Sequence, residues 1–230
     1  MRKNILFGLL LSIVSLNLWA DEITGVGELK INMSVQDFLN LPEIKDKDLR
    51  DTSVYAKVPG DFYMWKKTAE DSNIDGHSRI FSKDIVKYEF MMSIGVPNIL
   101  GKDRYKTTAV FYKENLVEIV ISDKLLDIKE ILTQKYGKPV VQNWLKRITC
   151  QNGFGAVTNQ LNGDIFYEWG KGKKITATLM NSISDCGKDM IGIYTVENSA
   201  VSKMIYESEA KSRKAFEAES RSNKASASKL

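Results

Sequence analysis

Histidine is almost absent from this chain of 230 residues, in which His77 is the only one. A single imidazole excludes zinc sites built on a histidine pair, iron sites with two histidines and proton relays between two histidines. A Ser/His/Asp triad would have to use His77, which lies in a polar stretch, and the chain contains no nucleophile elbow. The sequence therefore predicts no catalytic residue of the familiar hydrolase types.

Long apolar runs are also missing, except at the start of the chain. Arg2 and Lys3 precede an apolar run of about fourteen residues, Ile5 to Leu18, and the small residue Ala20 follows at the expected cleavage point. This is the pattern of a cleavable secretory signal peptide. The run is shorter than the roughly twenty residues that span a bilayer as a helix. We therefore expect residues 1–20 to be removed, the mature chain to start at Asp21, and the protein to be periplasmic or secreted without a stable membrane anchor.

Cysteine is scarce, with only Cys150 and Cys186 in the chain. Two cysteines in a protein exported to an oxidising compartment usually form a disulfide. Two free thiols or a metal pair would need partners that the chain lacks. The sequence therefore predicts a Cys150–Cys186 disulfide.

Charge of one sign does not accumulate in the body of the protein. The chain has 33 basic and 29 acidic residues, and the signal peptide holds two of the basic ones. The segment from Asn198 onward contains seven Lys/Arg and four Glu, so the body between Asp21 and Glu197 is close to neutral. Nucleic-acid binding needs a clustered basic face, and we expect no nucleic-acid partner.

One stretch resembles a metal-binding motif. Asp71, Asn73 and Asp75, followed by Gly76, match the first half of a calcium loop. The second half does not match, because Ser82 stands where a bidentate glutamate belongs. The same residue types favour turns, so a solvated loop is the alternative, and no metal or cofactor is predicted.

Carboxylates suited to glycoside hydrolysis cannot be located from spacing alone, since they need only be close in space. Glu168, between Tyr167 and Trp169, is the candidate for such chemistry. An exposed acid on an amphipathic strand is the other interpretation of the same residue.

Hydrophobic periodicity predicts an α+β fold of antiparallel sheet with packed helices. A capping box at Ser34 begins a short helix, and apolar residues at helical spacing predict a second helix over 124–136 that ends at Gly137. Strands are expected at 27–32, 61–66, 85–94, 107–112, 116–121, 164–169, 173–180 and 192–196. The order is compatible with two similar helix-plus-sheet halves, 21–122 and 123–197.

The last segment, 198–230, is expected to form a polar helix over about 199–222 and a disordered tail. It has only one small apolar cluster, around Val201, Met204 and Ile205. Its removal is therefore expected to leave the fold intact.

The stretch from Gly27 to Ser34 and the helix after it resemble the start of small exported bacterial domains. Those domains are typified by the outer-membrane-assembly lipoproteins and the β-lactamase inhibitory proteins. The resemblance covers about fifteen residues and departs from the pattern at Asn32, where glycine is usual, and in the lack of a lipidated cysteine. It implies a domain that binds another protein without catalysis, and it transfers no functional residue.

Aromatic residues on two predicted strands are the candidates for partner binding: Tyr63, Trp65, Tyr167 and Trp169. They alternate to both faces of their strands, so either both faces are covered or one presents an aromatic patch to a partner. The leading hypothesis is a non-enzymatic periplasmic inhibitor or immunity-type protein that binds another protein of the cell envelope. The alternatives are a structural accessory of an envelope assembly or secretion system, which would dock through the terminal helix, and a carboxylate-based envelope hydrolase.

Overall fold

The computed structural model describes residues 20–51, 63–71, 79–93, 104–123, 128–151, 153–184, 186 and 189–227. The helices are α1 (Val35–Leu39), α2 (Ile128–Tyr136) and α3 (Ser199–Ala227). The strands are β1 (Gly25–Val26), β2 (Leu29–Lys30), β3 (Asp48–Asp51), β4 (Tyr63–Lys67), β5 (Ile85–Met92), β6 (Tyr105–Tyr112), β7 (Asn115–Asp123), β8 (Val140–Asn143), β9 (Lys146–Gln151), β10 (Val157–Trp169), β11 (Ile175–Ser184) and β12 (Asp189–Asn198).

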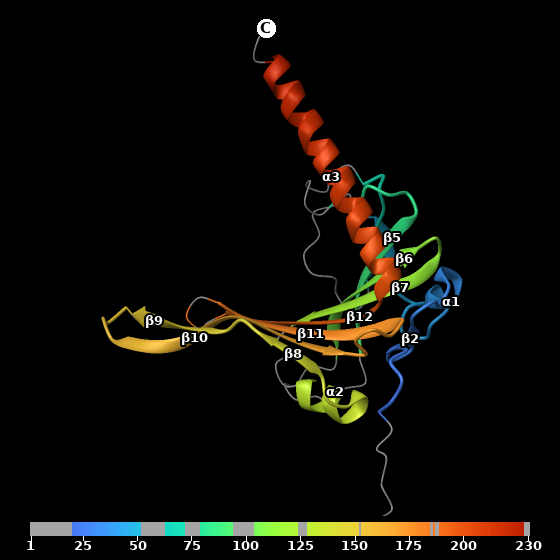
Figure 1. The fold of residues 1–230 in the computed structure, drawn as a ribbon. Helices are drawn as coiled ribbons and strands as arrows, with labels where there is room; N and C mark the ends of the chain where they lie inside the picture. The colour runs from blue at the N-terminus through green and yellow to red at the C-terminus, as the bar shows by residue number, and fades with distance from the viewer. Residues whose placement is uncertain are drawn as a thin grey trace, which may run out of the picture.

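A ten-stranded sheet forms the framework of the molecule (Figure 1). Its strands lie in the order β3-β4-β5-β6-β7-β12-β11-β10-β8, and β9 pairs with the remaining part of β10. The pairs are antiparallel except for β3 with β4. Strands β1 and β2 form a separate two-stranded sheet. The predicted α+β class and the C-terminal helix are thus confirmed.

The main core lies on one face of the sheet, under α1 and α2. Phe38 of α1 is fully buried, and its ring centroid lies 5.1 Å from that of Tyr88, 5.5 Å from Phe90 and 5.2 Å from Phe111. The buried residues of α2, Ile128 and Leu132, belong to the same cluster. Both helices thus bury their apolar faces against alternate residues of the strands, as period-2 alternation requires.

The capping box predicted at Ser34 is present. The Ser34 hydroxyl accepts a hydrogen bond of 3.0 Å from the backbone N–H of Asp37 and donates one of 2.7 Å to the Asp37 carboxylate. This satisfies an amide that the first turn leaves without a partner in the helix. The cap fixes where α1 begins and so positions Phe38 over the sheet.

The first turns of α3 cover the opposite face of the sheet over β5, β6 and β7 (Figure 1). Ile205 is buried against the side chains Ile80, Ile85, Val110 and Val117. The expectation that the segment after Asn198 lies outside the core is therefore wrong. The apolar cluster of this segment is small, but it covers a second group of buried side chains on the sheet, the second core.

Glu209, further along α3, attaches the helix to the segment that precedes β5. The Glu209 carboxylate accepts hydrogen bonds of 2.9 Å from the backbone N–H groups of Phe81 and Ser82. The rings of Phe81 and Phe216 lie 5.8 Å apart. Beyond this contact, α3 continues away from the sheet (Figure 1).

Candidate protein-binding surface

The sheet face opposite α2 carries a row of apolar side chains across β10, β11 and β12. Cross-strand register places Phe166 beside Met180, and Met180 beside Ile193. All three side chains are half-buried. The rings of Trp144 and Phe166 meet edge-on with centroids 5.0 Å apart, and Ile191 lies half exposed at 51% on the same face. We refer to these five residues as the apolar row.

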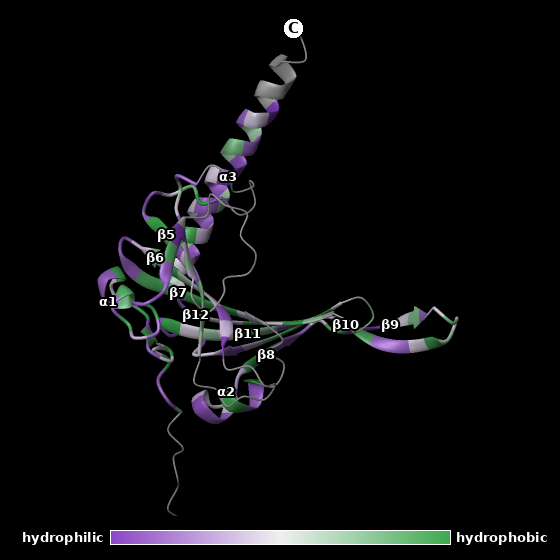
Figure 2. Cartoon of the chain, turned by 180° about the vertical axis from the view of Figure 1, so that it is seen from behind, coloured by the Kyte–Doolittle hydropathy of each residue, from purple (hydrophilic) through white to green (hydrophobic). Residues whose placement is uncertain are grey.

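Exposed hydrophobic side chains concentrate near the same end of the sheet. Six of the twelve exposed large hydrophobic residues in the described part of the chain fall within 140–161. They are Val140, Val141, Trp144, Phe154, Val157 and Leu161, with Trp144 at 55% and Phe154 at 99% exposure. They do not all share one face, because adjacent residues such as Val140 and Val141 point to opposite sides of the sheet. Trp144 shares the face of Phe166, where apolar side chains gather as is typical of an interaction surface. Hydropathy colouring shows that β9 and β10 carry both polar and apolar residues (Figure 2).

The strands β9 and β10 extend past the rest of the sheet as a two-stranded projection, which we call the arm: residues 146–151 paired with 157–162. The pairing of β8 with β10 continues into that of β9 with β10 without a register shift. The Trp144 N–H donates a 2.9 Å hydrogen bond to the Asp164 carbonyl between the two strands. Residues 140–151 therefore form one edge of the sheet in a single register, as two strands separated by Trp144 and Leu145.

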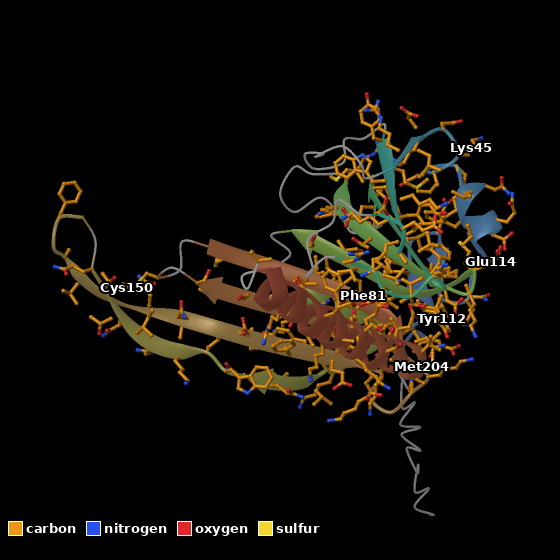
Figure 3. All side chains as sticks on the ribbon, turned by 90° about the horizontal axis from the view of Figure 1, so that it is seen from above. Lys45, Phe81, Tyr112, Glu114, Cys150 and Met204 are labelled. Atoms are coloured by element: carbon orange, nitrogen blue, oxygen red, sulfur yellow. A yellow bond between two sulfur atoms is a disulfide. The ribbon has the colours of Figure 1, made fainter. Side chains whose placement is uncertain are left out.

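A disulfide fixes the arm to the body. Cys150 of β9 and Cys186, which lies between β11 and β12, are joined as predicted, and the described part of the chain has no free cysteine. Figure 3 shows Cys150 well out along the arm, away from the dense side chains of the body. The link restrains a projection that has no core of its own, since Cys150 is the only residue of the arm that is buried.

Two of the four predicted partner-binding aromatics are core residues. Trp169 is 1% exposed, and its Nε1 donates a hydrogen bond of 2.8 Å to the Gly137 carbonyl at the end of α2. Trp65 is also buried. Both tryptophans are therefore packed inside the molecule in this structure.

The two predicted tyrosines keep more surface. Tyr63 is 36% exposed on β4, with the Arg50 guanidinium 3.8 Å from its ring centroid. Tyr167 is half-buried and packs against the core on the α2 side, with Lys129 Nζ 5.6 Å from its ring centroid. The two lie on strands at different ends of the sheet order, so the structure does not bring them together.

The hydrolase candidate Glu168 lies half-buried on the face of β10 that carries Phe166, opposite Thr178 of β11 and Val140 of β8. An open cleft of about 420 Å³ is lined by Asp21, Glu22, Thr24, Gly25, Gly27, Lys30, Lys135 and Tyr136. Glu168 does not line this cleft.

Two other carboxylates, one buried and one half-buried, lie next to each other. Glu118 of β7 and Glu197 of β12 are direct cross-strand partners. Burial raises the pKa of both side chains above the ordinary glutamate range, and Glu197 raises that of Glu118 further. Glu118 is 7% exposed, because α3 begins immediately after β12 and packs over this part of the sheet. The pair is closed to a substrate in this arrangement.

His77 and the loop positions Asn73 and Asp75 lie outside the described residues. Of the calcium-loop candidates, Asp71 is described, and its carboxylate accepts a 2.6 Å hydrogen bond from the Thr68 N–H within a turn. Within the described ranges, no group of three or more His, Cys, Asp or Glu side chains is arranged to hold a metal ion.

The sequence patterns did not predict the contact between Trp144 and Phe166, and they did not predict the arm. The stretch after Gly137 showed no strand periodicity, because both faces of the arm are exposed and the usual polar–apolar alternation is weak there. A signal existed in the composition: residues 140–151 contain no acidic residue, glycine or proline.

Comparison with known proteins does not identify this chain. No protein-family model, no curated protein and no solved structure matches the chain. Among the helices of the described residues, none has the length and apolar character needed to cross a membrane.

Proposed function

We propose that this chain is a non-enzymatic exported binding protein of the periplasmic inhibitor or immunity type. The observation that carries the proposal is the apolar row together with the exposed hydrophobic residues of 140–161. Aromatic anchors with aliphatic neighbours, placed on a rigid sheet, have the composition of interface hot spots. The partner is a protein of the cell envelope.

The sheet order supports two similar halves within the body. The first half runs through α1 and strands β4 to β7, and the second through α2 and strands β8 to β12. The last strands of the halves, β7 and β12, pair at the centre. We propose that the two halves share one plan, which is consistent with the expected resemblance to exported inhibitory domains. The part of the sheet face that carries the apolar row, beyond the area covered by α3, is then the surface for a partner.

Site-specific photocrosslinking in the exporting cell tests the proposal. A photoreactive phenylalanine analogue replaces Ile191 in the apolar row or, as a control, Lys173 in the exposed turn between β10 and β11. We expect a protein adduct from position 191 and none from position 173. The adduct should be lost when Phe166→Ser is added. Adducts of equal yield from both positions would contradict the proposal.

The enzymatic alternative is tested separately. A hydrolase that used Glu168 would lose on the order of a hundredfold in rate or more in the Glu168→Gln variant. The proposed binding protein keeps its biological activity and its crosslinked adduct in this variant. Loss of activity in a protein that melts normally would replace the binding proposal with the hydrolase.

A further inference from the structure

The edge formed by residues 140–151 has backbone groups on one side that no described strand uses. Strands β8 and β9 both pair with β10 and with no other strand in the described ranges. A strand at the edge of a sheet presents a row of N–H and C=O groups that can pair with another chain. With about 3.4 Å per residue, this edge is about 40 Å long.

Sheet proteins usually guard such edges, and this one has few of the usual guards. Proline, bulges and short length all discourage pairing. Residues 140–151 contain no proline, their register with β10 has no bulge, and most of their side chains are exposed. The edge is interrupted only at Trp144 and Leu145, where the Asn143 side chain accepts a 2.9 Å hydrogen bond from the Leu145 N–H, a contact that a partner strand would replace. The disulfide at Cys150 holds the strand in an extended shape before any partner arrives, which lowers the entropy cost of pairing.

The charge on the edge indicates which kind of strand fits. Lys146 and Arg147 are adjacent at its centre, and no acidic residue occurs from Val140 to Gly163. Adjacent residues of a strand point to opposite faces, so a basic side chain is present on each face of the edge. A partner strand with acidic residues opposite these positions would form favourable cross-strand pairs on both faces.

A second copy of this chain fits the edge poorly. Antiparallel pairing of two copies over the full edge would put Lys146 opposite Leu145 of the second copy. Four basic side chains would then lie within two residues of the symmetry axis. Lys146 of each copy would lie diagonally across from Arg147 of the other on the same face, within reach of like-charge repulsion.

We infer that residues 140–151 bind an acidic, extended segment of a partner protein, which adds as a further strand to this edge of the sheet. The inference rests on the proposed binding function and names the contact that the partner makes. Main-chain hydrogen bonds supply the attachment, and Lys146 and Arg147 supply the selectivity. Trp144, at the centre of the same edge, connects the added strand to the apolar row.

Two synthetic peptides test the inference on the mature protein. Each has twelve residues of alternating valine and serine, with two central glutamates in one peptide and two central lysines in the other. We expect the glutamate peptide to bind about tenfold more tightly and to slow amide hydrogen exchange in residues 140–151. The opposite edge of the sheet, β3, carries Asp48 and Asp51 and serves as an internal control that this peptide should not protect.

Charge-reversal variants provide the matched controls. Lys146→Glu combined with Arg147→Glu should reverse the preference between the peptides. Lys171→Glu combined with Lys173→Glu changes the net charge equally, at an exposed turn away from the edge, and should leave the preference unchanged. A change of preference in both double variants would overturn the inference, because the effect would then come from net charge alone.

Three further results would overturn it: no protection of residues 140–151 by either peptide, equal affinity for both peptides, or protection that grows with protein concentration alone while light scattering gives a dimer mass. The last result would assign the edge to a second copy. An adduct from Ile191 in cells, together with failure of both peptides, would keep the proposed function and reject this contact. Loss of the adduct with intact peptide binding would reject the proposed function and keep this contact.

Discussion

The Tyr206 hydroxyl of α3 donates a hydrogen bond of 2.5 Å to Oε1 of Glu118 on β7. Glu118 is the buried member of the two adjacent carboxylates, so the helix contributes a donor where the sheet concentrates negative charge. Burial raises the pKa of Glu118, and Glu197 raises it further, whereas the Tyr206 bond and Lys87 lower it in part. The attachment of α3 is therefore coupled to the protonation of this site.

Stability should fall as pH rises through the raised pKa of Glu118. The folded state binds this proton more tightly than the unfolded state, so the contribution is complete below the ordinary glutamate pKa and is lost above the raised one. Glu118→Gln should flatten the decline, since an amide carries no charge and can still accept the Tyr206 bond. Urea unfolding at several pH values gives the unfolding free energy of the wild-type protein and of the Glu118→Gln variant. The same dependence of this free energy on pH in both proteins would contradict the prediction.

Removing the Tyr206 hydroxyl, which is the hydrogen-bond donor, should destabilise the protein. Tyr206→Phe leaves the buried Glu118 oxygen without its helix partner and should cost about 1–2 kcal/mol of unfolding free energy at neutral pH. The loss should shrink in the Glu118→Gln background, because a neutral amide oxygen accepts a weaker hydrogen bond than a carboxylate does. Additive losses in the double variant would show that the two side chains act independently.

The packing of α3 predicts a sharp contrast between neighbouring residues. Ile205 is 8% exposed in the second core, whereas Met204 is 46% exposed. Ile205→Ala should cost about 2–4 kcal/mol of unfolding free energy, and Met204→Ala should cost less than about 0.5 kcal/mol. Deleting residues 198–230 should destabilise the body at least as much as Ile205→Ala. Equal melting temperatures for the deletion and the full chain would refute the second core.

Two tryptophans separate stability from binding. Trp169→Ala removes a buried indole and its hydrogen bond to Gly137 and should cost roughly 3–5 kcal/mol. Trp144→Ala removes a half-exposed ring and should leave the melting temperature nearly unchanged while lowering the yield of the adduct from position 191. Thermal melting and crosslinking yield, measured on both variants, give the comparison. The opposite pattern would move the contact surface away from the apolar row.

Gly163 marks the point where the arm leaves the sheet. Its φ is +120°, and a Cβ there would lie 2.6 Å from the Trp144 carbonyl oxygen. Gly163→Ala should therefore cost more than about 1 kcal/mol and speed hydrogen exchange in residues 140–151. Gly153→Ala is the control, because a Cβ at position 153 meets nothing within 4 Å. Similar exchange rates in both variants would show that the close approach does not shape the arm.

Much of the framework was predictable from local patterns. The helix cap at Ser34, the hairpin of β6 and β7, the end of α2 before Gly137 and the hairpin of β10 and β11 all follow from signals carried by a few adjacent residues. The Cys150–Cys186 link followed from composition. These features depend on sequence neighbours or on a count, so the sequence alone defines them.

The candidate site depends on contacts between distant parts of the chain, and this is why sequence reasoning missed it. The Trp144–Phe166 contact arises only when β8 pairs with β10. Trp169 looked like an interface residue because its strand has aromatics on both faces, and only the docking of α2 shows which face is covered. The sequence of β9 shows no clear alternation of polar and apolar residues, because neither face of this strand packs on a core.

The two projections of the molecule, α3 and the arm, give it an extended outline. At 1.5 Å per residue α3 is about 43 Å long, and the thirteen residues of β10 reach a similar length. They point in different directions from the body (Figure 1). A particle of this outline diffuses more slowly than a sphere of equal mass. The monomer should therefore elute early in gel filtration, and an elution volume read against globular standards would overstate its mass.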